Sequence, residues 1–368
     1  MACADRVRLR AVSSIAASLL AGGCAAPAVE PWFSSAPPVV LVAAQDAGVR
    51  DLRATYRSAA CRLLPDGTPC DNVLLPLPGE GNAPAGAPPT NLAQRYRIVF
   101  VPGLFSECFD SYARPFSDVQ AALAAEGFAA EIVRLPGRGT SAANAARLAD
   151  HFAAVAHDPR PIIVFAYSKG LPDTLEFVVR HRKEASRIAA IVSVAGAANG
   201  SPLADDLYAP YRRWGAAFPL PGCEPGSGEE IHDLRRDVRL EWWRMNGSAV
   251  KVPVFALVAA PRPEQVSPAT RSSFRRLARI EPRNDGKLLA QDQVVPGGYL
   301  LGYVNADHWA IAIPLSDAFP SWSALFRDGV PRIALARAAI EVVADTLAVQ
   351  AGQAAATAPV STGRAGTP

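Results

Sequence analysis

The serine at position 168 stands where an apolar run gives way to a helical pattern. The run PIIVFAYS (161–168) is rich in β-branched residues, and Lys169 and Gly170 follow it. A strand, a serine flanked by small residues and a helix form a nucleophile elbow, in which a tight turn exposes the serine oxygen beside a helix N-terminus. The first small residue is Ala166, where the motif has glycine. The alternative role for Ser168 is a helix cap, which also favours serine.

His308 is the histidine best placed to act as a base. It lies in GYVNADHWAIAIP, directly after an apolar segment that we expect to be the last strand. In hydrolases built on a parallel sheet, the nucleophilic serine precedes the acid and the acid precedes the histidine, and His308 fits this order. The alternative is a core histidine packed beside Trp309. The remaining histidines favour surface or packing roles: His151, His157, His181 and His232.

Two aspartates that precede His308 are candidates for the acid. A triad acid accepts a hydrogen bond from the imidazole, so that the other ring nitrogen can take the serine proton. Asp285 lies in EPRNDGKLL, where NDG favours a sharp turn next to a strand, and we predict that it is the acid. Asp292, in AQDQVVPGG, is the alternative and is otherwise expected to position its loop. Asp307 is adjacent to His308 and should point away from the ring.

A parallel sheet would bring these three residues together. Short β-branched runs ended by Gly, Ser or Ala-Pro read as strands buried on both faces, and helical patterns alternate with them. This alternation predicts an α/β fold with a mostly parallel sheet and helices on both sides. Ligands of such sheets bind outside the carboxyl ends of the strands, which is where Ser168 falls. The expected strands are RYRIVFVPG (95–103), AAEIVRLPG (129–137), PIIVFAYS (161–168), RIAAIVSVAG (187–196) and VPVFALVAA (252–260).

The N-terminus has the features of an export signal. Three arginines among the first ten residues precede an apolar stretch (11–21) that is too short to span a bilayer. The following LLAGGCAAP resembles a bacterial lipoprotein signal, in which Cys24 would be acylated and would anchor the protein to a membrane. Ala21 stands where such signals usually have leucine, so secretion without a lipid is the alternative. Either outcome predicts an exported protein, in the bacterial cell envelope or secreted.

The mature chain divides at a change in composition. The Gly/Pro/Ala-rich PGEGNAPAGAPPT (78–90) reads as a linker between an N-terminal region and a more regular domain. The expected organisation is a signal segment (1–23), an N-terminal extension with its linker (24–92), a catalytic domain (93–352) with an insertion at about 203–250, and a disordered tail (353–368).

Four cysteines remain if Cys3 leaves with the signal and Cys24 carries lipid. An even number in an oxidising compartment favours disulfides. Cys61 and Cys70 bracket CRLLPDGTPC, whose PDG favours a tight turn, so the expected pairs are Cys61–Cys70 and Cys108–Cys223. Four buried thiols are the alternative.

Size and charge exclude some classes of partner. The chain has 368 residues, half of them apolar, so it can bury a large core. Its formal net charge is only +3, with the charges interspersed. No run of five or six like charges is present to bind nucleic acid, so a nucleic-acid partner is not expected.

Together these motifs resemble the α/β-hydrolase superfamily, and in particular bacterial secreted lipases and esterases. The resemblance covers roughly residues 96–350. It implies Ser168 as nucleophile, His308 as base and Asp285 as acid, with an oxyanion hole from the backbone NH groups of Leu104 and Lys169. It rests on VPGLF (101–105), AYSKG (166–170), VAGAANGSPLAD (194–205), NDG (284–286) and DHW (307–309).

The sequence also departs from those lipases. They usually have His-Gly before the oxyanion residue, and this chain has Pro102 and Gly103. Calcium-binding lipases carry an aspartate two residues after the catalytic histidine, where this chain has Ala310. We therefore expect neither a structural calcium nor any other metal or cofactor.

In hydrolases of this type the insertion at about 203–250 commonly forms a cap or lid. Its aromatic side chains either close over an acyl chain or pack the cap onto the domain, and the sequence leaves both roles open. A Cys108–Cys223 bond would tie this cap to the loop after the first strand. The aromatic residues are Tyr208, Tyr211, Trp214, Phe218, Trp242 and Trp243.

The sequence thus predicts an exported serine hydrolase that cleaves carboxylic esters through an acyl-enzyme, with a small-molecule ester or lipid as substrate. One alternative is an acyltransferase or thioesterase that uses the same triad. The other is a non-catalytic envelope lipoprotein on a hydrolase scaffold.

Overall fold

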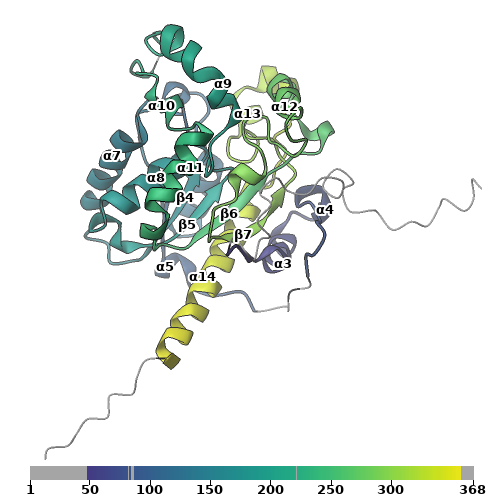
Figure 1. Ribbon diagram of the computed structural model, residues 1–368. Helices are drawn as coiled ribbons and strands as arrows, with labels where there is room; N and C mark the ends of the chain where they lie inside the picture. Colours follow the sequence, from purple (N-terminus) through teal and green to yellow (C-terminus); the bar gives the residue numbers. More distant parts are fainter. Residues whose placement is uncertain (1–47, 82, 84–86, 221, 358–368) are drawn as a thin grey trace, which may run out of the picture.

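The computed structural model describes residues 48–81, 83, 87–220 and 222–357 (Figure 1). The expected signal segment, Cys24 and the end of the expected disordered tail lie outside the described residues. Within the described part, no helix is both long enough and apolar enough to cross a membrane.

The centre of the fold is a seven-stranded sheet in which every neighbouring pair of strands is parallel. The strand order is β1-β7-β6-β5-β4-β2-β3. All residues of β4 and β6 are buried, as expected for strands covered on both faces. The predicted α/β fold is confirmed. The strands are β1 (Arg50–Asp51), β2 (Arg97–Val101), β3 (Ala129–Ile132), β4 (Ile162–Tyr167), β5 (Ile188–Val194), β6 (Val254–Ala259) and β7 (Tyr299–Val304).

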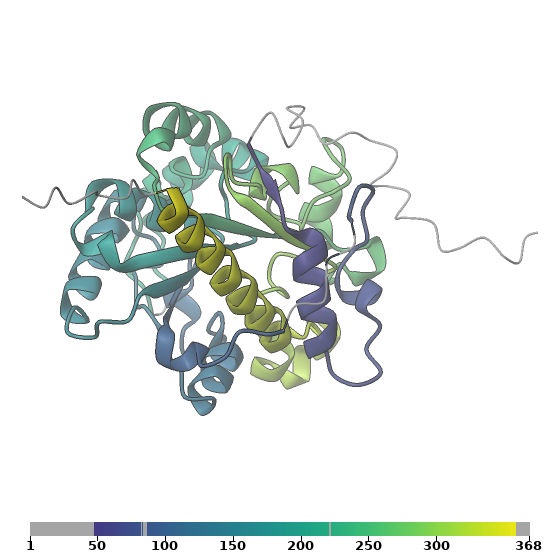
Figure 2. The ribbon, with the colours of Figure 1, turned by 90° about the horizontal axis from the view of Figure 1, so that it is seen from below.

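Helices cover both faces of this sheet. On one face, α3 (Arg53–Leu63), α6 (Ser117–Ala125) and α14 (Arg332–Thr357) share one core cluster, and Figure 2 shows α14 lying across the strands beside α3. On the other face, α7 (Ser141–Ala154) and α8 (Gly170–Arg180) share a second cluster. The remaining α-helices are α4 (Cys70–Val73), α5 (Leu92–Arg95), α9 (Pro202–Pro210), α10 (Glu229–His232), α11 (Arg236–Asn246), α12 (Arg271–Leu277) and α13 (Leu315–Ala318).

The N-terminal extension packs on the domain that it was expected to precede. Its β1 pairs with β7 at the edge of the sheet, and its α3 lies against α14. Tyr56 of α3 is fully buried and donates a hydrogen bond to the Leu335 carbonyl of α14 (3.0 Å). A two-residue strand is too short to show periodicity, so the sequence did not reveal this contact.

α8 ends at Arg180, and a separate 3-10 turn follows it at Glu184–Arg187. The end of α14 differs from the sequence expectation. At the C-terminus, α14 continues to Thr357, so the first residues of the expected disordered tail are helical. That stretch is rich in alanine, the residue with the highest helix propensity.

Both predicted disulfides are present. Cys61–Cys70 joins α3 to α4. Cys108–Cys223 joins the loop after β2 to the insertion between β5 and β6.

If the N-terminal segment belongs to the folding unit, Tyr56→Ala should lower the free energy of unfolding by about 3–5 kcal/mol, the cost of removing a buried aromatic side chain. Urea denaturation measures this. Tyr112→Ala is the matched control, because Tyr112 is 64% exposed. Equal stabilities of the two variants would show that the segment is not part of the cooperative unit.

Candidate active site

The turn at Ser168 has the backbone of a nucleophile elbow. β4 ends at Tyr167, α8 begins at Gly170, and Ser168 between them has a φ of 53°, in the left-handed region. Such a conformation is unfavourable for a residue with a Cβ and persists only where its surroundings hold it. Here the Ser168 NH donates to the Val194 carbonyl of β5 (3.2 Å), and the Leu171 NH donates to the Ser168 carbonyl (3.2 Å).

Two glycines allow the elbow to lie against the end of β2. A Cβ at Gly170 would come within 2.5 Å of the Val101 carbonyl oxygen and 2.6 Å of that of Pro102. A Cβ at Gly103 would lie 2.9 Å from the Cβ of Ser168. Side chains at either position would push the β2 loop away from the serine, so glycine is required at both.

Ala166, which replaces the first glycine of the motif, lies inside the core. It is fully buried, pairs with Val101 of β2 and Ser193 of β5, and belongs to the same core cluster as Leu171. Its methyl group is therefore accommodated by apolar packing on the α7/α8 face of the sheet.

The side chains of Ser168, His308 and Asp285 form one hydrogen-bonded chain. Ser168 Oγ lies 2.9 Å from His308 Nε2, and His308 Nδ1 lies 2.7 Å from Asp285 Oδ2. His308 and Asp285 are buried, whereas Ser168 is half-buried and open to a reactant. The structure thus brings together the three residues that the sequence singled out.

The turn that carries Asp285 orients its carboxylate. Oδ1 accepts hydrogen bonds from the NH groups of Lys287 (2.8 Å) and Leu288 (2.7 Å), which leaves Oδ2 facing the imidazole. Gly286 provides the turn with a φ of 88°. In addition, the His308 NH donates to the Asp285 carbonyl (2.9 Å), so acid and base are also joined through the backbone.

The loop of His308 is supported by residues around it. As expected, the carboxylate of Asp307 points away from the ring, and it accepts hydrogen bonds from the Ser267 NH (2.8 Å) and the Thr270 hydroxyl (2.9 Å). The Tyr167 hydroxyl donates to the His308 carbonyl (2.8 Å), and burial raises the pKa of Tyr167 well above its usual value. We did not predict this role of Tyr167 from the sequence, although a hydroxyl at the end of an apolar strand was a signal.

The backbone NH groups of Leu104 and Lys169 were expected to form the oxyanion hole. Neither has a hydrogen-bond partner among the described residues. The next residue along, Phe105, has a φ of 61°, and its NH donates to the Gly137 carbonyl (2.7 Å). The Lys169 side chain is buried away from the serine, with Nζ 2.6 Å from Asp173 Oδ1. Both NH groups therefore remain available for a ligand oxygen.

Asp292 is not part of the hydrogen-bonded chain. It lies in a 3-10 turn (Gln291–Gln293), where its carboxylate pairs with Arg236 at the start of α11 (Nε to Oδ2, 3.1 Å). Burial raises the pKa of Asp292 to about 7. Its carbonyl accepts the NH of Asn199 (2.9 Å), which follows β5, and its ion pair with Arg236 links the loop before β7 to the insertion.

The insertion, called the cap below (residues 203–250), contains α9, α10 and α11 and lies between β5 and β6 in the chain; α9 and α10 are at the top of Figure 1. Its aromatic residues differ in their surroundings. Trp242 and Trp243 donate hydrogen bonds to Glu176 and to the Ala198 carbonyl, respectively, and so anchor the cap to the domain, whereas Tyr211 donates to Glu230 within the cap. Trp214 and Phe218 are 73% and 62% exposed.

Other exposed aromatic residues lie on the segment that a disulfide joins to the cap. Phe109 and Tyr112 follow the β2 loop, and the Tyr112 ring stacks on Phe319 (6.2 Å between centroids), which lies beyond His308 in the chain. Cys108–Cys223 joins this region to the cap. Exposed apolar side chains thus extend from the cap to the segment after His308.

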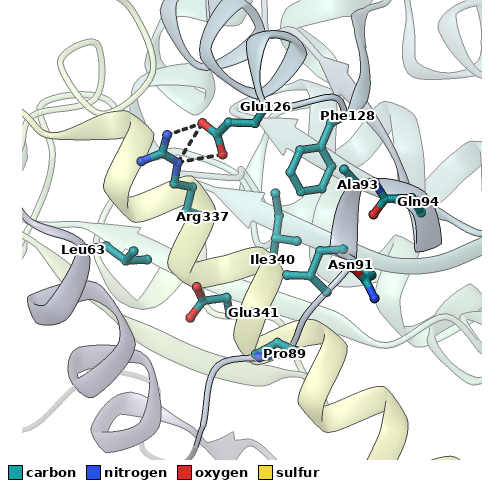
Figure 3. Close-up of a pocket in the computed structure, with 11 residues that line it drawn as sticks. Leu63, Pro89, Asn91, Ala93, Gln94, Glu126, Phe128, Arg337, Ile340 and Glu341 are labelled. Carbon is teal, nitrogen blue, oxygen red and sulfur yellow. Dashed lines mark hydrogen bonds and ion pairs between the residues drawn. The ribbon is translucent and has the colours of Figure 1, made fainter.

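Two cavities in the described part of the chain lie elsewhere. One of about 450 Å³ is formed by α14, α5 and the segment before α5, with an ion pair between Arg337 and Glu126 at its edge (Figure 3). The other, of about 300 Å³, is at the N-terminal ends of β1, β6 and β7. Neither is lined by Ser168, His308 or Asp285, so we do not assign them to the chemistry. The described residues include no cluster of three or more His, Cys, Asp or Glu side chains placed to hold a metal ion.

Comparison with solved structures identifies the family to which this fold belongs. The crystal structure of the metagenomic carboxyl esterase MGS0156 is similar, with 33% sequence identity and a TM-score of 0.78 over 87% of this chain and 99% of the esterase. The chain belongs to the α/β-hydrolase family of carboxyl esterases. A Bacillus licheniformis lipase, BlEst2 in its propeptide form, has the same fold. Its sequence identity is 20% and its TM-score is 0.51, over 65% of this chain and 51% of the lipase chain. No protein-family model and no curated protein matches.

The raised pKa of Asp292 predicts how stability depends on pH. Between its usual pKa of 3.8 and its folded value of about 7, the folded hydrolase holds a proton that the unfolded chain releases. Asp292 should therefore lower the free energy of unfolding as the pH rises through this range.

Asp292→Asn mimics the protonated carboxyl and should remove this contribution. Urea denaturation at about pH 4.5 and about pH 8 should show that the variant gains stability relative to wild type at the higher pH. The same stability difference between the two proteins at both pH values would contradict the assignment.

Proposed function

We propose that the hydrolase cleaves carboxylic esters through an acyl-enzyme on Ser168. The proposal rests on the hydrogen-bonded chain from Ser168 through His308 to Asp285. Ser168 Oγ attacks the ester carbonyl carbon while its proton passes to His308 Nε2, and the tetrahedral intermediate expels the alcohol, which takes that proton. A water molecule then gives a proton to His308, attacks the acyl carbonyl and releases the carboxylic acid, and the proton returns to Ser168.

The groups around the serine each have a role in this scheme. Asp285 holds the Nδ1–H tautomer of His308 and stabilises the imidazolium that forms. The NH groups of Leu104 and Lys169 receive the negative charge that develops on the carbonyl oxygen, a contribution on the order of 3 kcal/mol per donor. The free state of both NH groups supports this assignment.

The exposed aromatic residues support an apolar acyl chain of medium or long length. Trp214 and Phe218 of the cap, together with Phe109 and Tyr112, offer apolar surface along which an acyl chain can leave the serine. A small-molecule ester or a lipid that carries such an acyl chain is therefore the proposed substrate class.

We also propose that the protein is exported, in the bacterial cell envelope or secreted. Two disulfides persist in an oxidising compartment and support export. Acylation of Cys24, which lies outside the described residues, would add a membrane anchor.

A fluorophosphonate probe tests the nucleophile. Wild type should be labelled, because the probe phosphonylates an activated serine, and Ser168→Ala should not be labelled. Gel fluorescence measures the labelling, and Ser186→Ala is the control, since its hydroxyl donates only to the nearby Lys183 carbonyl. A folded wild type that resists labelling would instead favour a non-catalytic binding protein.

Steady-state turnover of a nitrophenyl ester tests the acid. Asp285→Asn should lower kcat by about 10⁴, because the amide favours the wrong imidazole tautomer. Asp292→Asn should keep kcat within a few-fold of wild type. The reverse ranking would assign the acid to Asp292.

A further inference from the structure

Arg138 is a buried cation that the proposed reaction does not use. It lies in the loop after β3 and is 5% exposed. Its guanidinium donates to the carbonyls of Phe218 (Nη1, 2.7 Å), Gly215 (Nη2, 2.7 Å) and Ala216, and its Nε donates to the Tyr211 hydroxyl (3.2 Å). Every hydrogen bond of this side chain therefore goes to the cap segment 211–218.

These acceptors lie at and just beyond the end of a helical turn. Tyr211–Gly215 forms one π-helical turn, and the carbonyls at and beyond its end also accept backbone hydrogen bonds, at Gly215 from the Phe218 NH (3.1 Å) and at Ala216 from the Gly226 NH (2.8 Å). Arg138 gives each of these two carbonyls a second donor and also donates to Phe218, because a planar guanidinium can serve several acceptors at once. Its charge also suits the negative end of a helical turn.

Glu230 balances the buried charge from within the cap. It is fully buried, with Oε1 at 4.0 Å from Arg138 Nε. Its oxygens accept hydrogen bonds from the Tyr211 hydroxyl (2.7 Å) and from the Gly228 NH (2.9 Å). Arg138, Tyr211 and Glu230 thus form one connected network between the core and the cap.

The residue before Arg138 holds the loop that carries Leu104. The Phe105 NH donates to the Gly137 carbonyl (2.7 Å), and the Gly137 NH donates to Glu107 Oε2 (3.0 Å). A Cβ on Gly137 would lie 3.1 Å from the backbone of Phe105, so the two loops are in close contact. Adjacent residues of one loop therefore hold the cap and the Leu104 loop.

The cap and the Leu104 loop also touch each other. The rings of Phe105 and Tyr211 meet edge to face (6.1 Å between centroids), with the Arg138 guanidinium near both. The Leu104 side chain packs against the cap cluster that includes Ile231. Movement of the cap segment would therefore reach the NH of Leu104.

We propose that Arg138 is a positioning residue that couples the cap to the oxyanion hole: it fixes the cap segment 211–218 and, through Gly137, the loop that presents the Leu104 NH. This inference rests on the proposed esterase function. It implies that loss of Arg138 slows the chemistry even for an ester too short to reach the cap, because the oxyanion donor loses its position.

The rest of the cap should remain attached when Arg138 is replaced. Asp233 Oδ2 accepts the Ser141 NH at the start of α7 (2.6 Å), and Trp243 donates to the Ala198 carbonyl (2.7 Å). The Cys108–Cys223 bond is also unaffected by the change.

The test compares kcat and KM for 4-nitrophenyl acetate and 4-nitrophenyl octanoate in wild type, Arg138→Met and Arg138→Lys. For the acetate, kcat should fall by about 10- to 100-fold in Arg138→Met, with KM little changed, because misplaced catalytic groups affect the transition state. Arg138→Lys keeps the charge without the planar guanidinium, so its kcat should lie between those of wild type and Arg138→Met. Arg97→Met is the control, since Arg97 is largely buried but pairs with Glu131 and Asp158; it should keep the wild-type kcat.

An acetate kcat within two-fold of wild type in Arg138→Met would overturn the inference. So would an effect on the octanoate KM alone, because that would mean that the cap only binds the acyl chain. If Arg138→Met does not fold, Glu107→Ala provides the test, because it removes the acceptor of the Gly137 NH. This variant should have a lower kcat for the acetate, and an unchanged kcat would overturn the inference. A wild type that cleaves neither ester would overturn the proposed function itself, which distinguishes the two failures.

Discussion

The left-handed backbone at Ser168 is the constraint on which the rest of the site depends. A serine with a φ of 53° is held by hydrogen bonds to β5 and α8 rather than by its own preference. The same turn leaves no room for a Cβ at Gly170 or Gly103. The end of β2 is therefore held against the turn, and Leu104, which follows Gly103, lies next to the segment that carries Ser168 and Lys169 in the fold.

The parallel sheet brings residues that are distant in the sequence close together. Ser168 follows β4, His308 lies in the loop after β7, and Asp285 lies in the turn before β7. The Asp285 carboxylate is oriented by backbone hydrogen bonds from Lys287 and Leu288 of its own turn, and the His308 backbone is held by Tyr167 and Asp285. The reacting groups are therefore held by short local contacts on a rigid frame, the arrangement that preorganised catalysis requires.

The sequence predicted those features that are local or follow from chain order. The strand-serine-glycine-helix pattern located Ser168, and the order of acid and histidine located Asp285 and His308. Contacts between residues that are far apart in the sequence left no such pattern. The carbonyls that accept hydrogen bonds from Arg138, for example, are 77 to 80 residues away. The two-residue strand β1 and the pairing of Asp292 with Arg236 were hidden for similar reasons, since neither changes the periodicity of the sequence.

The central claim is that Ser168 carries the acyl group during turnover. The most direct measurement is acid quenching of the hydrolase during turnover of a nitrophenyl octanoate, followed by peptide mass spectrometry. We expect an octanoyl group on Ser168 in the peptide that contains AYSKG, and none on the corresponding peptide of Ser168→Ala. An acyl group on another residue, or turnover with no acylated peptide at all, would contradict it.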